Sequence, residues 1–423
     1  MNTPLRSSSR PLSWSKRLLL TVAVAVHLSL LISCWTGWYT RFTFDSVATH
    51  GDRAWDFNAV YQAGHNVLTG RSVYESDNDK IDVVVLRYTP YRYLPFLAMV
   101  LGVPFNMLDP VAAYTAWVFI IEVTLLVSAG YAWRLADDPN HGVVLASMWL
   151  LATPFYLEVY LGQFNLVQAA LVWALLLTSQ HGLTWRGDVW WVLSLLWKQN
   201  TGLLAPVYMR EKRWRSLMLA AMVVLAMSLP YWLAVPGSFA DFMRNLYSSQ
   251  PTHQLGNLGA RQWLYSLTSW LAPGLSGAAH VWIGRGWVAL IISVTALTTW
   301  KAPRAQAAEL LCLWMSSYLL VYHDVWEHHY LLTLPVCVWL YHRERSPWVL
   351  ACWALLALWT PYILIDPAGA AGWQESMRWM PLTPRWLDTV YHSSKAIPAL
   401  ALWGWQVYRL VRQEPCLTDC GTS

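Results

Sequence analysis

The sequence predicts an all-α, polytopic membrane protein with about 11–13 membrane segments. Of its 423 residues, 56% are hydrophobic and 13% are charged, whereas about 25% are charged in an average soluble protein. Trp occurs 30 times and Tyr 21 times. Both residue types accumulate at membrane–water interfaces, where an apolar ring and a polar tip each find suitable surroundings. A transmembrane β-barrel would instead show alternating segments of about ten residues, and the sequence has no such pattern.

Apolar segments recur along the whole chain, which we expect to form one integral membrane domain over residues 1–423. A further segment near 260–272 is amphipathic, as is typical of a helix that lies along the membrane surface. The short segments near 94–108 and 189–208 are candidates for partial or broken helices. The apolar segments lie near residues 18–38, 94–108, 111–133, 142–157, 163–180, 189–208, 215–235, 279–300, 307–322, 329–341, 347–365 and 396–411.

Short basic clusters between the apolar segments predict the orientation of the chain, because Lys and Arg favour cytoplasmic loops. The net charge of +5 is therefore no indication of nucleic-acid binding. Five full crossings between the first outward loop and the cluster at 210–215 would place Arg134 outside, against the same rule. The stretches predicted to face outward are 39–92, 237–278, 323–328 and 367–394, and the basic clusters lie at the N-terminus, 210–215, 301–304, 342–345 and 409–412.

The first outward loop, residues 39–92, contains the strongest candidate for catalysis. Loops of about 50 residues in a compact domain are usually functional. Most acidic residues of this loop are typical of a solvated surface, whereas Asp56 precedes Phe57, Val60 and Tyr61 at helical spacing. A short amphipathic helix on the membrane would hold this carboxylate over the helix bundle. Asp56 is therefore a candidate general base.

Polar residues that lie inside apolar segments are the second group of candidate functional residues. Gly162-Gln163-Phe164-Asn165 opens one apolar helix, and Lys198-Gln199-Asn200 interrupts another. A Lys at the centre of a membrane helix costs about 2.5–3.5 kcal/mol on insertion scales. Lys198 should therefore face a cavity or a partner, where it would receive a phosphate. A Lys that extends to the interface from a helix end is the alternative.

The run His323-Asp324-Val325-Trp326-Glu327-His328-His329-Tyr330 is the third signal. It does not match the helical metalloprotease pattern, and no second cluster offers ligands at a fixed spacing, so we expect no metal. Imidazolium and indole groups hydrogen-bond to anionic or sugar ligands. The run is therefore a candidate substrate-binding element, with a structural cluster at the interface as the alternative.

A weaker candidate is Asn257-Leu258-Gly259-Ala260-Arg261 in the second large outward stretch. Gly256 and Gly259 permit a tight turn. Arg261 would suit an anionic group, and Asn257 is a candidate substrate-binding residue.

Taken in order, these elements resemble glycosyltransferase family 87, whose members include polyprenyl-phosphomannose-dependent mannosyltransferases with the C-type membrane fold. The resemblance spans roughly residues 50–335. The chain departs from the family pattern at Gln199, where Pro is usual, and at Gly259, where the stretch near Asn257 lacks the expected Asn-x-Ser. The matching elements are Asp56 to Gly64, Leu68 to Tyr74, Tyr91 to Pro95, Gly162 to Asn165, Lys198, and Trp326 to Tyr330.

The resemblance implies transfer of a hexose, with mannose as the first candidate, from a polyprenyl-phosphate donor to an extracytoplasmic glycan or glycolipid. The reaction would be a single inverting displacement at a bacterial inner membrane, without a cofactor. Asp56 would remove the acceptor proton, and Lys198, His328 and Arg92 would stabilise the leaving phosphate. The residues implied in substrate binding are Tyr61, Arg92, Tyr93, Gln163, Asn165, Lys198, Asn257, Glu327, His328 and His329.

Two other functions stay open at this point. A transporter or flippase for a lipid-linked or small anionic substrate would use Lys198, Glu122 and Glu158 as coupling groups inside the membrane. Such proteins usually have paired halves with broken helices at matching positions, and the sequence has no such symmetry. A structural or assembly protein without catalysis would be unaffected by Asp56→Asn.

Overall fold

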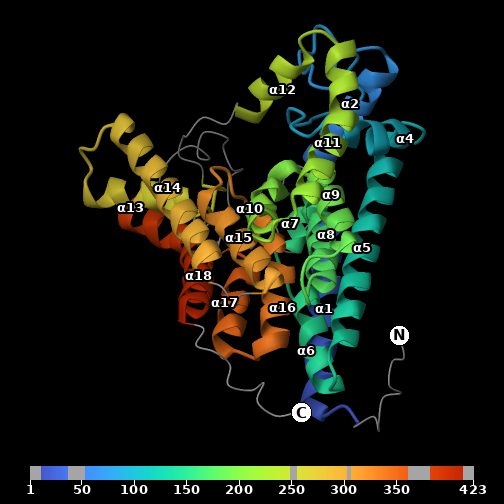
Figure 1. Ribbon diagram of the computed structural model, residues 1–423. Coiled ribbons are helices and arrows are strands. Elements are labelled where there is room, and N and C mark those ends of the chain that lie inside the picture. The colour runs from blue at the N-terminus through green and yellow to red at the C-terminus, as the bar shows by residue number, and fades with distance from the viewer. Residues whose placement is uncertain (1–10, 37–52, 248–254, 303–305, 361–381, 413–423) are drawn as a thin grey trace.

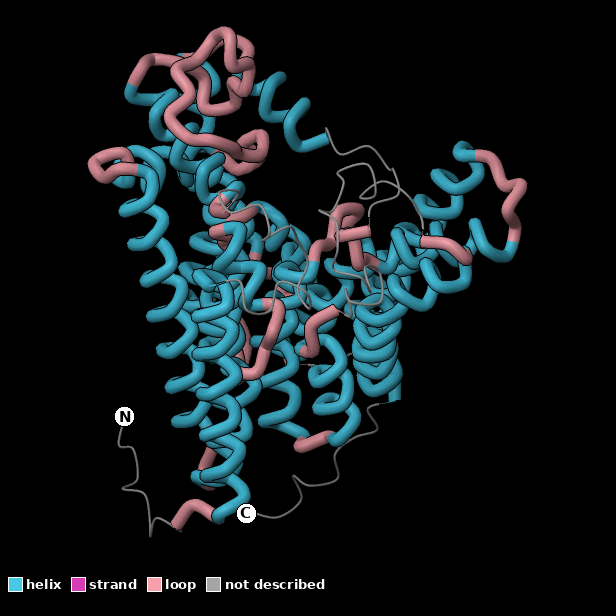
Figure 2. Tube along the Cα trace, turned by 180° about the vertical axis from the view of Figure 1, so that it is seen from behind, coloured by secondary structure: helices cyan, strands magenta, loops and turns pink. Residues whose placement is uncertain are grey.

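The computed structural model describes residues 11–36, 53–247, 255–302, 306–360 and 382–412. Within these ranges the regular secondary structure consists of helices, and no strand is present (Figures 1 and 2). The predicted all-α fold class is therefore confirmed. The first outward loop lies outside the described residues as far as residue 52.

Seven helices form a tall column, on the right in Figure 1. They are α1 (Trp14–Thr36), α5 (Pro110–Leu135), α6 (Pro139–Leu150), α7 (Phe155–Leu161), α8 (Asn165–Thr178), α9 (Trp185–Trp197) and α11 (Trp214–Ala234). Helices α1 and α5 pack against α6, and α8 packs against α5 and α9. The short helix α12 (Ser238–Tyr247) follows α11 and leads away from the column.

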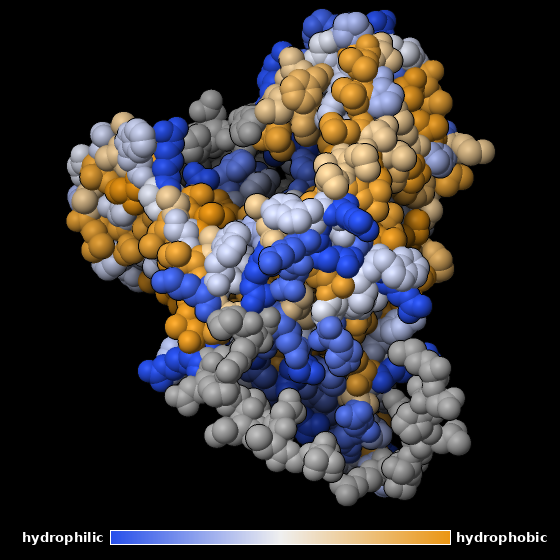
Figure 3. Space-filling model, in the orientation of Figure 1, coloured by the Kyte–Doolittle hydropathy of each residue, from blue (hydrophilic) through white to orange (hydrophobic). Residues whose placement is uncertain are grey.

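The second group of helices is built around α18 (Arg385–Arg412), which contacts α13, α14, α15 and α17. The amphipathic segment expected near 260–272 is the helix α13, and its buried side faces α18. Figure 3 shows a hollow between this group and the column. The other helices of the group are α13 (Ala260–Leu271), α14 (Gly277–Lys301), α15 (Ala307–Val321), α16 (Leu334–Glu344) and α17 (Pro347–Ala357).

The column and α14 present an apolar surface suited to lipid. In the described part of the chain, α1, α5, α11 and α14 are long and apolar enough to cross a bilayer, and the pair α6–α7, bent by 41°, makes a fifth span if counted as one. Large apolar side chains on these helices face outward, among them Phe119 at 68% exposure and Leu233 at 73%. Soluble proteins rarely expose continuous apolar surfaces of this kind. The chain is a multi-pass integral membrane protein.

Helix starts follow ordinary capping chemistry. Asp109 precedes Pro110, and its side chain accepts the backbone N–H groups of Val111 and Ala112 at the start of α5. Thr184 caps α9 in the same way. Such caps satisfy N–H groups that have no partner within a helix.

The basic cluster at the start of α1 lies beside the turn between α5 and α6, and the one at the end of α18 lies beside α15 and α16. The backbone N–H of Ser13 donates to Oδ1 of Asn140 at 2.9 Å, which places the start of α1 beside the start of α6. At the end of α18, Arg409 pairs with Glu309 of α15 and Glu344 of α16. The turn between α5 and α6 therefore lies on the same side as the basic N-terminal segment.

The segment before α5 does not cross the membrane. Residues Pro95–Phe105 form α3 (Pro95–Leu97), a π-helical turn η1 (Ala98–Gly102) and α4 (Val103–Phe105). At 1.5 Å per residue these three pieces cover about half of the roughly 30 Å hydrocarbon core. Of the two alternatives, the partial helix near 94–108 is confirmed, so α5 makes the first return crossing and Arg134 need not lie outside.

The second interrupted segment is also a broken helix. Helix α9 ends at Trp197, and Lys198 is extended, with φ −156° and ψ 117°. A 3₁₀ helix, η2 (Gln199–Leu204), and α10 (Ala205–Arg210) follow. A second 3₁₀ helix, η3 (Glu327–Thr333), leads into α16 in the same manner.

The helix α2 (Trp55–Leu68) lies across η1, and two glycines set its distance from that turn. A Cβ atom on Gly64 would lie 2.1 Å from the carbonyl carbon of Gly102, and a Cβ on Gly102 would lie 2.4 Å from the carbonyl oxygen of Val60. No side chain larger than hydrogen fits without a backbone shift. This contact holds α2 against η1.

Gly64→Ala should lower the free energy of unfolding by about 1–3 kcal/mol, because overpacking forces the backbones of α2 and η1 apart. The measurement is the thermal unfolding midpoint in detergent. Gly130→Ala is the matched control, since a Cβ there meets nothing within 4 Å and Ala favours the helix. Equal midpoints for the two variants would contradict the packing account.

Candidate active site

The start of α2 is fixed against the end of α7. Ala54, which precedes α2, has a left-handed backbone with φ 66°, and its N–H donates to the carbonyl oxygen of Tyr160 at 2.9 Å. Phe57 is buried, and a Cβ on Gly162 would lie 2.5 Å from its Cβ. Asp56, in the first turn of α2, is thereby brought to the connection between α7 and α8.

Two hydrogen bonds hold the Asp56 carboxylate. Thr89 Oγ1 donates to Oδ1 at 2.8 Å, and Gln163 Nε2 donates to Oδ2 at 2.6 Å. The N–H of Thr89 also donates to the carbonyl oxygen of Trp55 at 3.3 Å, so its loop is tied to α2. The Asp56 side chain remains partly exposed. Hydrogen bonds to both oxygens thus fix the orientation of the carboxylate, and its exposed part remains accessible to a substrate.

The surroundings of Asp56 raise its pKa above the usual carboxyl range. Burial is the largest effect, because removing water disfavours the charged form. The hydrogen bond from Thr89, the positive charges of Lys198 and Arg92, and the hydrogen bond from Gln163 act in the opposite direction. A carboxylate whose pKa is raised toward the working pH is a stronger base than a free Asp.

The corner between α7 and α8 positions Gln163 and Asn165. Gly162 ends α7 with φ +65°, a left-handed conformation that glycine adopts without strain. Trp117 Nε1 donates to the carbonyl oxygens of Gly162 and Gln163 at 3.2 and 3.3 Å. With the backbone so held, Gln163 reaches Asp56 and Asn165 reaches Lys198.

Lys198 lies where α9 breaks, and its ammonium group faces the same corner. Its Nζ donates to Asn165 Oδ1 at 2.7 Å and lies 5.9 Å from the centre of the Tyr93 ring. The ammonium also acts electrostatically on Asp56. The structure therefore places a cation, an aromatic face and the candidate base in one cluster.

Arg92 connects this cluster to the His323–Tyr330 run. Its guanidinium pairs with Asp324 at 3.6 Å, and its carbonyl oxygen accepts from Gln199 Nε2 at 3.0 Å. Asp324 also accepts from Trp326 Nε1 at 2.7 Å. Segments that are far apart in sequence thus meet around one polar centre.

His328 and His329 are buried beside each other, with ring centres 4.4 Å apart. His329 Nδ1 accepts from the N–H of Trp326 at 3.0 Å. Among the described residues, neither ring nitrogen of His328 has a hydrogen-bond partner, and Lys198 acts on it electrostatically. A buried polar group without a partner costs free energy, so His328 is suited to receive a ligand atom.

The side chains of Tyr61 and Asn257 bind backbone groups. The hydroxyl of Tyr61 donates to the carbonyl oxygen of Leu108 at 2.8 Å. Asn257 donates to the carbonyl oxygen of His323 at 2.6 Å and accepts the N–H of Val325 at 3.1 Å. These hydrogen bonds connect neither side chain to Asp56 or Lys198, so their roles in substrate binding stay predictions.

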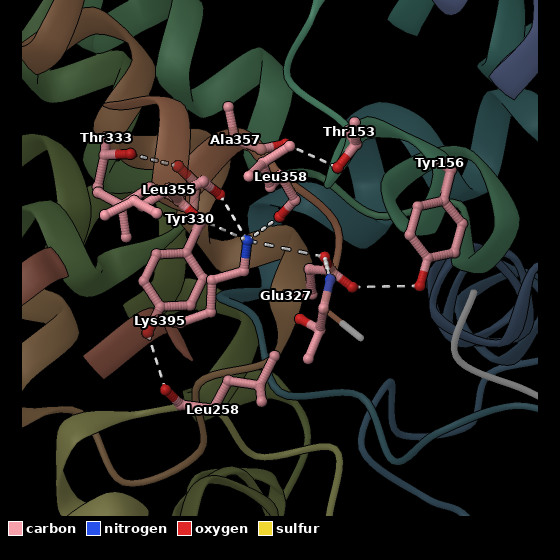
Figure 4. Close-up of polar contacts among 12 residues, drawn as sticks. Thr153, Tyr156, Leu258, Glu327, Tyr330, Thr333, Leu355, Ala357, Leu358 and Lys395 are labelled. Atoms are coloured by element: carbon pink, nitrogen blue, oxygen red, sulfur yellow. Dashed lines mark hydrogen bonds and ion pairs between the residues drawn. The ribbon is translucent and has the colours of Figure 1, made fainter. Parts of the chain in front are cut away.

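Glu327 belongs to a separate buried network, shown in Figure 4. Its carboxylate accepts from the Tyr156 hydroxyl at 3.2 Å and from the N–H of Thr360 at 2.8 Å, and it pairs with Lys395 at 3.9 Å. Lys395 Nζ also donates to carbonyl oxygens at the end of α17, those of Leu355, Leu356 and Leu358. Glu327 thereby joins η3 to α7, α17 and α18.

Two residues of the site were not among the sequence candidates. Thr89 lies 33 positions from the carboxylate that it binds, and a single Thr in a loop has no periodic signal. From sequence, Glu158 is a candidate only as a coupling group of a transporter, whereas in the structure it contacts Asn165 and the start of α8. The sequence feature that could have identified Glu158 is a carboxylate inside an apolar segment.

The described residues hold no group of three or more His, Cys, Asp or Glu side chains arranged as a metal site. The cluster supplies an oriented carboxylate, a nearby ammonium and guanidinium, and a buried imidazole. These groups suit removal of a proton from one reactant and stabilisation of an anion on another.

Glu327→Ala should lower the free energy of unfolding by about 3–5 kcal/mol, because it leaves the buried Lys395 ammonium without its carboxylate. The double variant Glu327→Leu with Lys395→Met should recover most of this loss, since it removes both charges. Thermal unfolding midpoints in detergent test this. A Glu327→Ala protein as stable as wild type, with altered substrate affinity, would instead assign Glu327 to substrate binding.

The model of glycosyltransferase family 87 matches residues 91–322, which is more than half of the chain and includes Arg92, Gln163, Asn165 and Lys198. Asp56 and His328 lie outside the matched range. No curated protein matches the chain significantly. The chain belongs to glycosyltransferase family 87 and is a membrane glycosyltransferase.

Proposed function

We propose that this protein transfers a hexose, with mannose as the first candidate, from a polyprenyl-phosphate donor to a glycan or glycolipid. The observation that carries the proposal is a doubly hydrogen-bonded carboxylate, Asp56, beside a partly exposed cation, Lys198, that acts on it electrostatically. A sugar joined to a lipid through phosphate presents both a carbon open to attack and an anion that departs. The lipid chain suits a protein with an apolar outer surface.

The reaction proceeds by a single displacement at the anomeric carbon. The acceptor hydroxyl oxygen forms a bond to that carbon while its proton passes to Asp56, and the bond from the carbon to the phosphate oxygen breaks. The electron pair of that bond leaves with the phosphate, so the configuration at the carbon inverts. Base catalysis of this kind is typically worth 10²–10⁴-fold in rate.

The leaving polyprenyl phosphate gains negative charge, and Lys198, Arg92 and His328 are placed to stabilise it. Lys198 uses one N–H on Asn165, which leaves two for phosphate oxygens. Fixed charges in a site with little water stabilise such charge better than water does. Tyr93 and Gln163 border the same space and orient the sugar.

We propose that the active site lies on the extracytoplasmic side of a bacterial inner membrane. The support is the distance of the site from the basic N-terminal segment. Asn140, at the start of the α6–α7 pair, contacts the segment that precedes α1, whereas Tyr160, at the end of the pair, contacts the start of α2 beside Asp56. Because basic segments favour the cytoplasmic side of the membrane, we expect Asp56 to lie on the extracytoplasmic side.

Asp56→Asn should reduce transfer of labelled mannose from polyprenyl phosphate by about 10²–10⁴-fold, because the amide cannot take the proton. The measurement is product formation by membranes that contain equal amounts of each protein. Asp79→Asn, an exposed change in the same loop, is the control and should keep wild-type activity. Equal activity of the two variants would overturn the assignment of the base.

If the wild-type protein is inactive with polyprenyl-phosphate mannose, a panel of other lipid-phosphate sugars identifies the donor. Failure across the panel would reject the lipid-phosphate donor class. Movement of an intact lipid-linked sugar across the membrane would then favour the transporter.

The pH dependence of the rate tests whether the hydrogen bond from Thr89 lowers the pKa of Asp56. Thr89 stabilises the ionised carboxylate, so Thr89→Val should raise the Asp56 pKa further. The base works when ionised, and activity is lost as pH falls through its pKa; in the variant this loss should therefore begin at a higher pH. Thr69→Val, in the exposed turn after α2, is the control and should leave the profile unchanged. An acidic limb that does not move in Thr89→Val would contradict the hydrogen bond's role.

A further inference from the structure

Glu158 is a buried carboxylate beside the site for which the mechanism above has no use. It lies in α7 with no exposed surface, and Asn165 is equally buried. Glu158 Oε1 accepts the N–H of Leu166 at 2.7 Å, and Oε2 accepts from Asn165 Nδ2 at 3.4 Å. Asn165 Oδ1 in turn accepts from Lys198 Nζ. A three-residue chain thus runs from a carboxylate to the candidate phosphate-binding ammonium.

The direction of this chain is determined by chemistry. A carboxylate only accepts hydrogen bonds and an ammonium only donates them, while an Asn amide has one end of each kind. Glu158 must therefore face the NH₂ of Asn165, which turns the amide oxygen toward Lys198. A neutral amide in place of the carboxylate would remove this constraint at the Glu158 end.

We propose that Glu158 is a positioning residue, which orients the Asn165 amide and through it aims the Lys198 ammonium at the leaving phosphate. This inference rests on the proposed function. It adds a residue to the reaction that touches neither the sugar nor the phosphate. The backbone carbonyl of Glu158 also accepts the N–H of Gln163 at 2.8 Å, so one residue supports both the cation and the partner of the base.

The alternative role, a cap for the start of α8, is separable from this one. A Gln at position 158 still offers an oxygen to the Leu166 N–H and leaves the backbone bond to Gln163 intact. Its NH₂ then faces Asn165, so the Asn165 amide must turn and present its own NH₂ to Lys198. Glu158→Gln thus keeps the cap and breaks only the chain to the ammonium.

The test compares Glu158→Gln with the double variant Glu158→Gln, Asn165→Asp. The single variant should lose about 10- to 100-fold in kcat, the value of one charge-assisted hydrogen bond. In the double variant the carboxylate introduced by Asn165→Asp accepts from both neighbours, so the hydrogen-bond pattern is restored and most of the activity should return. Glu122→Gln is the control, since this carboxylate joins α5 to His27 of α1, outside the cluster.

Two results would overturn the proposal: a Glu158→Gln enzyme with wild-type kcat, or a double variant no more active than the single one at equal thermal stability. If Glu158→Gln does not fold, Asn165→Asp provides a second test: its carboxylate faces that of Glu158, so kcat should fall, and the double variant, which is neutral at position 158, should be more active than Asn165→Asp alone. Asp56→Asn is assayed in parallel with the same donor. An active Asp56→Asn enzyme rejects the proposed function, whereas an inactive one beside an intact Glu158→Gln enzyme rejects only the positioning role.

Discussion

The site depends on the polar corner between α7 and α8, because buried polar groups must find partners inside an apolar bundle. Gly162 permits the left-handed turn that forms the corner. From it Gln163 binds the Asp56 carboxylate and Asn165 binds the Lys198 ammonium. The carboxylate of α2 and the ammonium at the break after α9 are thereby held together by one short segment of backbone.

The rest of the fold serves this arrangement. The close contact of Gly64 with Gly102 sets α2 against η1, and the contact of Phe57 with Gly162 brings the first turn of α2 to the corner. Helix α9 ends at Trp197, and the extended backbone of Lys198 places this residue beside the site. The buried network of Glu327 and Lys395 anchors η3, which carries His328, to the second group of helices.

Much of the site could be predicted from sequence where a polar residue interrupts an apolar pattern, as Gln163, Asn165 and Lys198 do. Such residues are costly in a membrane and so must have partners. The hydrogen-bond or ion-pair partner of each such residue could not be predicted from the sequence pattern. Thr89 lies in an irregular loop without a periodic pattern, and the motif around Glu327 does not reveal that its carboxylate pairs with Lys395. The number of crossings between residues 94 and 208 stayed open for the same reason, since hydropathy does not distinguish a half-length helix from a span.

The proposed reaction requires the acceptor's base and the donor's phosphate to lie on opposite sides of the anomeric carbon. A structure with a non-transferable phosphonate analogue of a polyprenyl-phosphate sugar tests it most directly. We expect the phosphonate oxygens within hydrogen-bond distance of Lys198 and the face of the sugar opposite the phosphonate turned toward Asp56. A phosphonate bound away from Lys198, or a sugar whose anomeric carbon Asp56 cannot approach, would contradict the account.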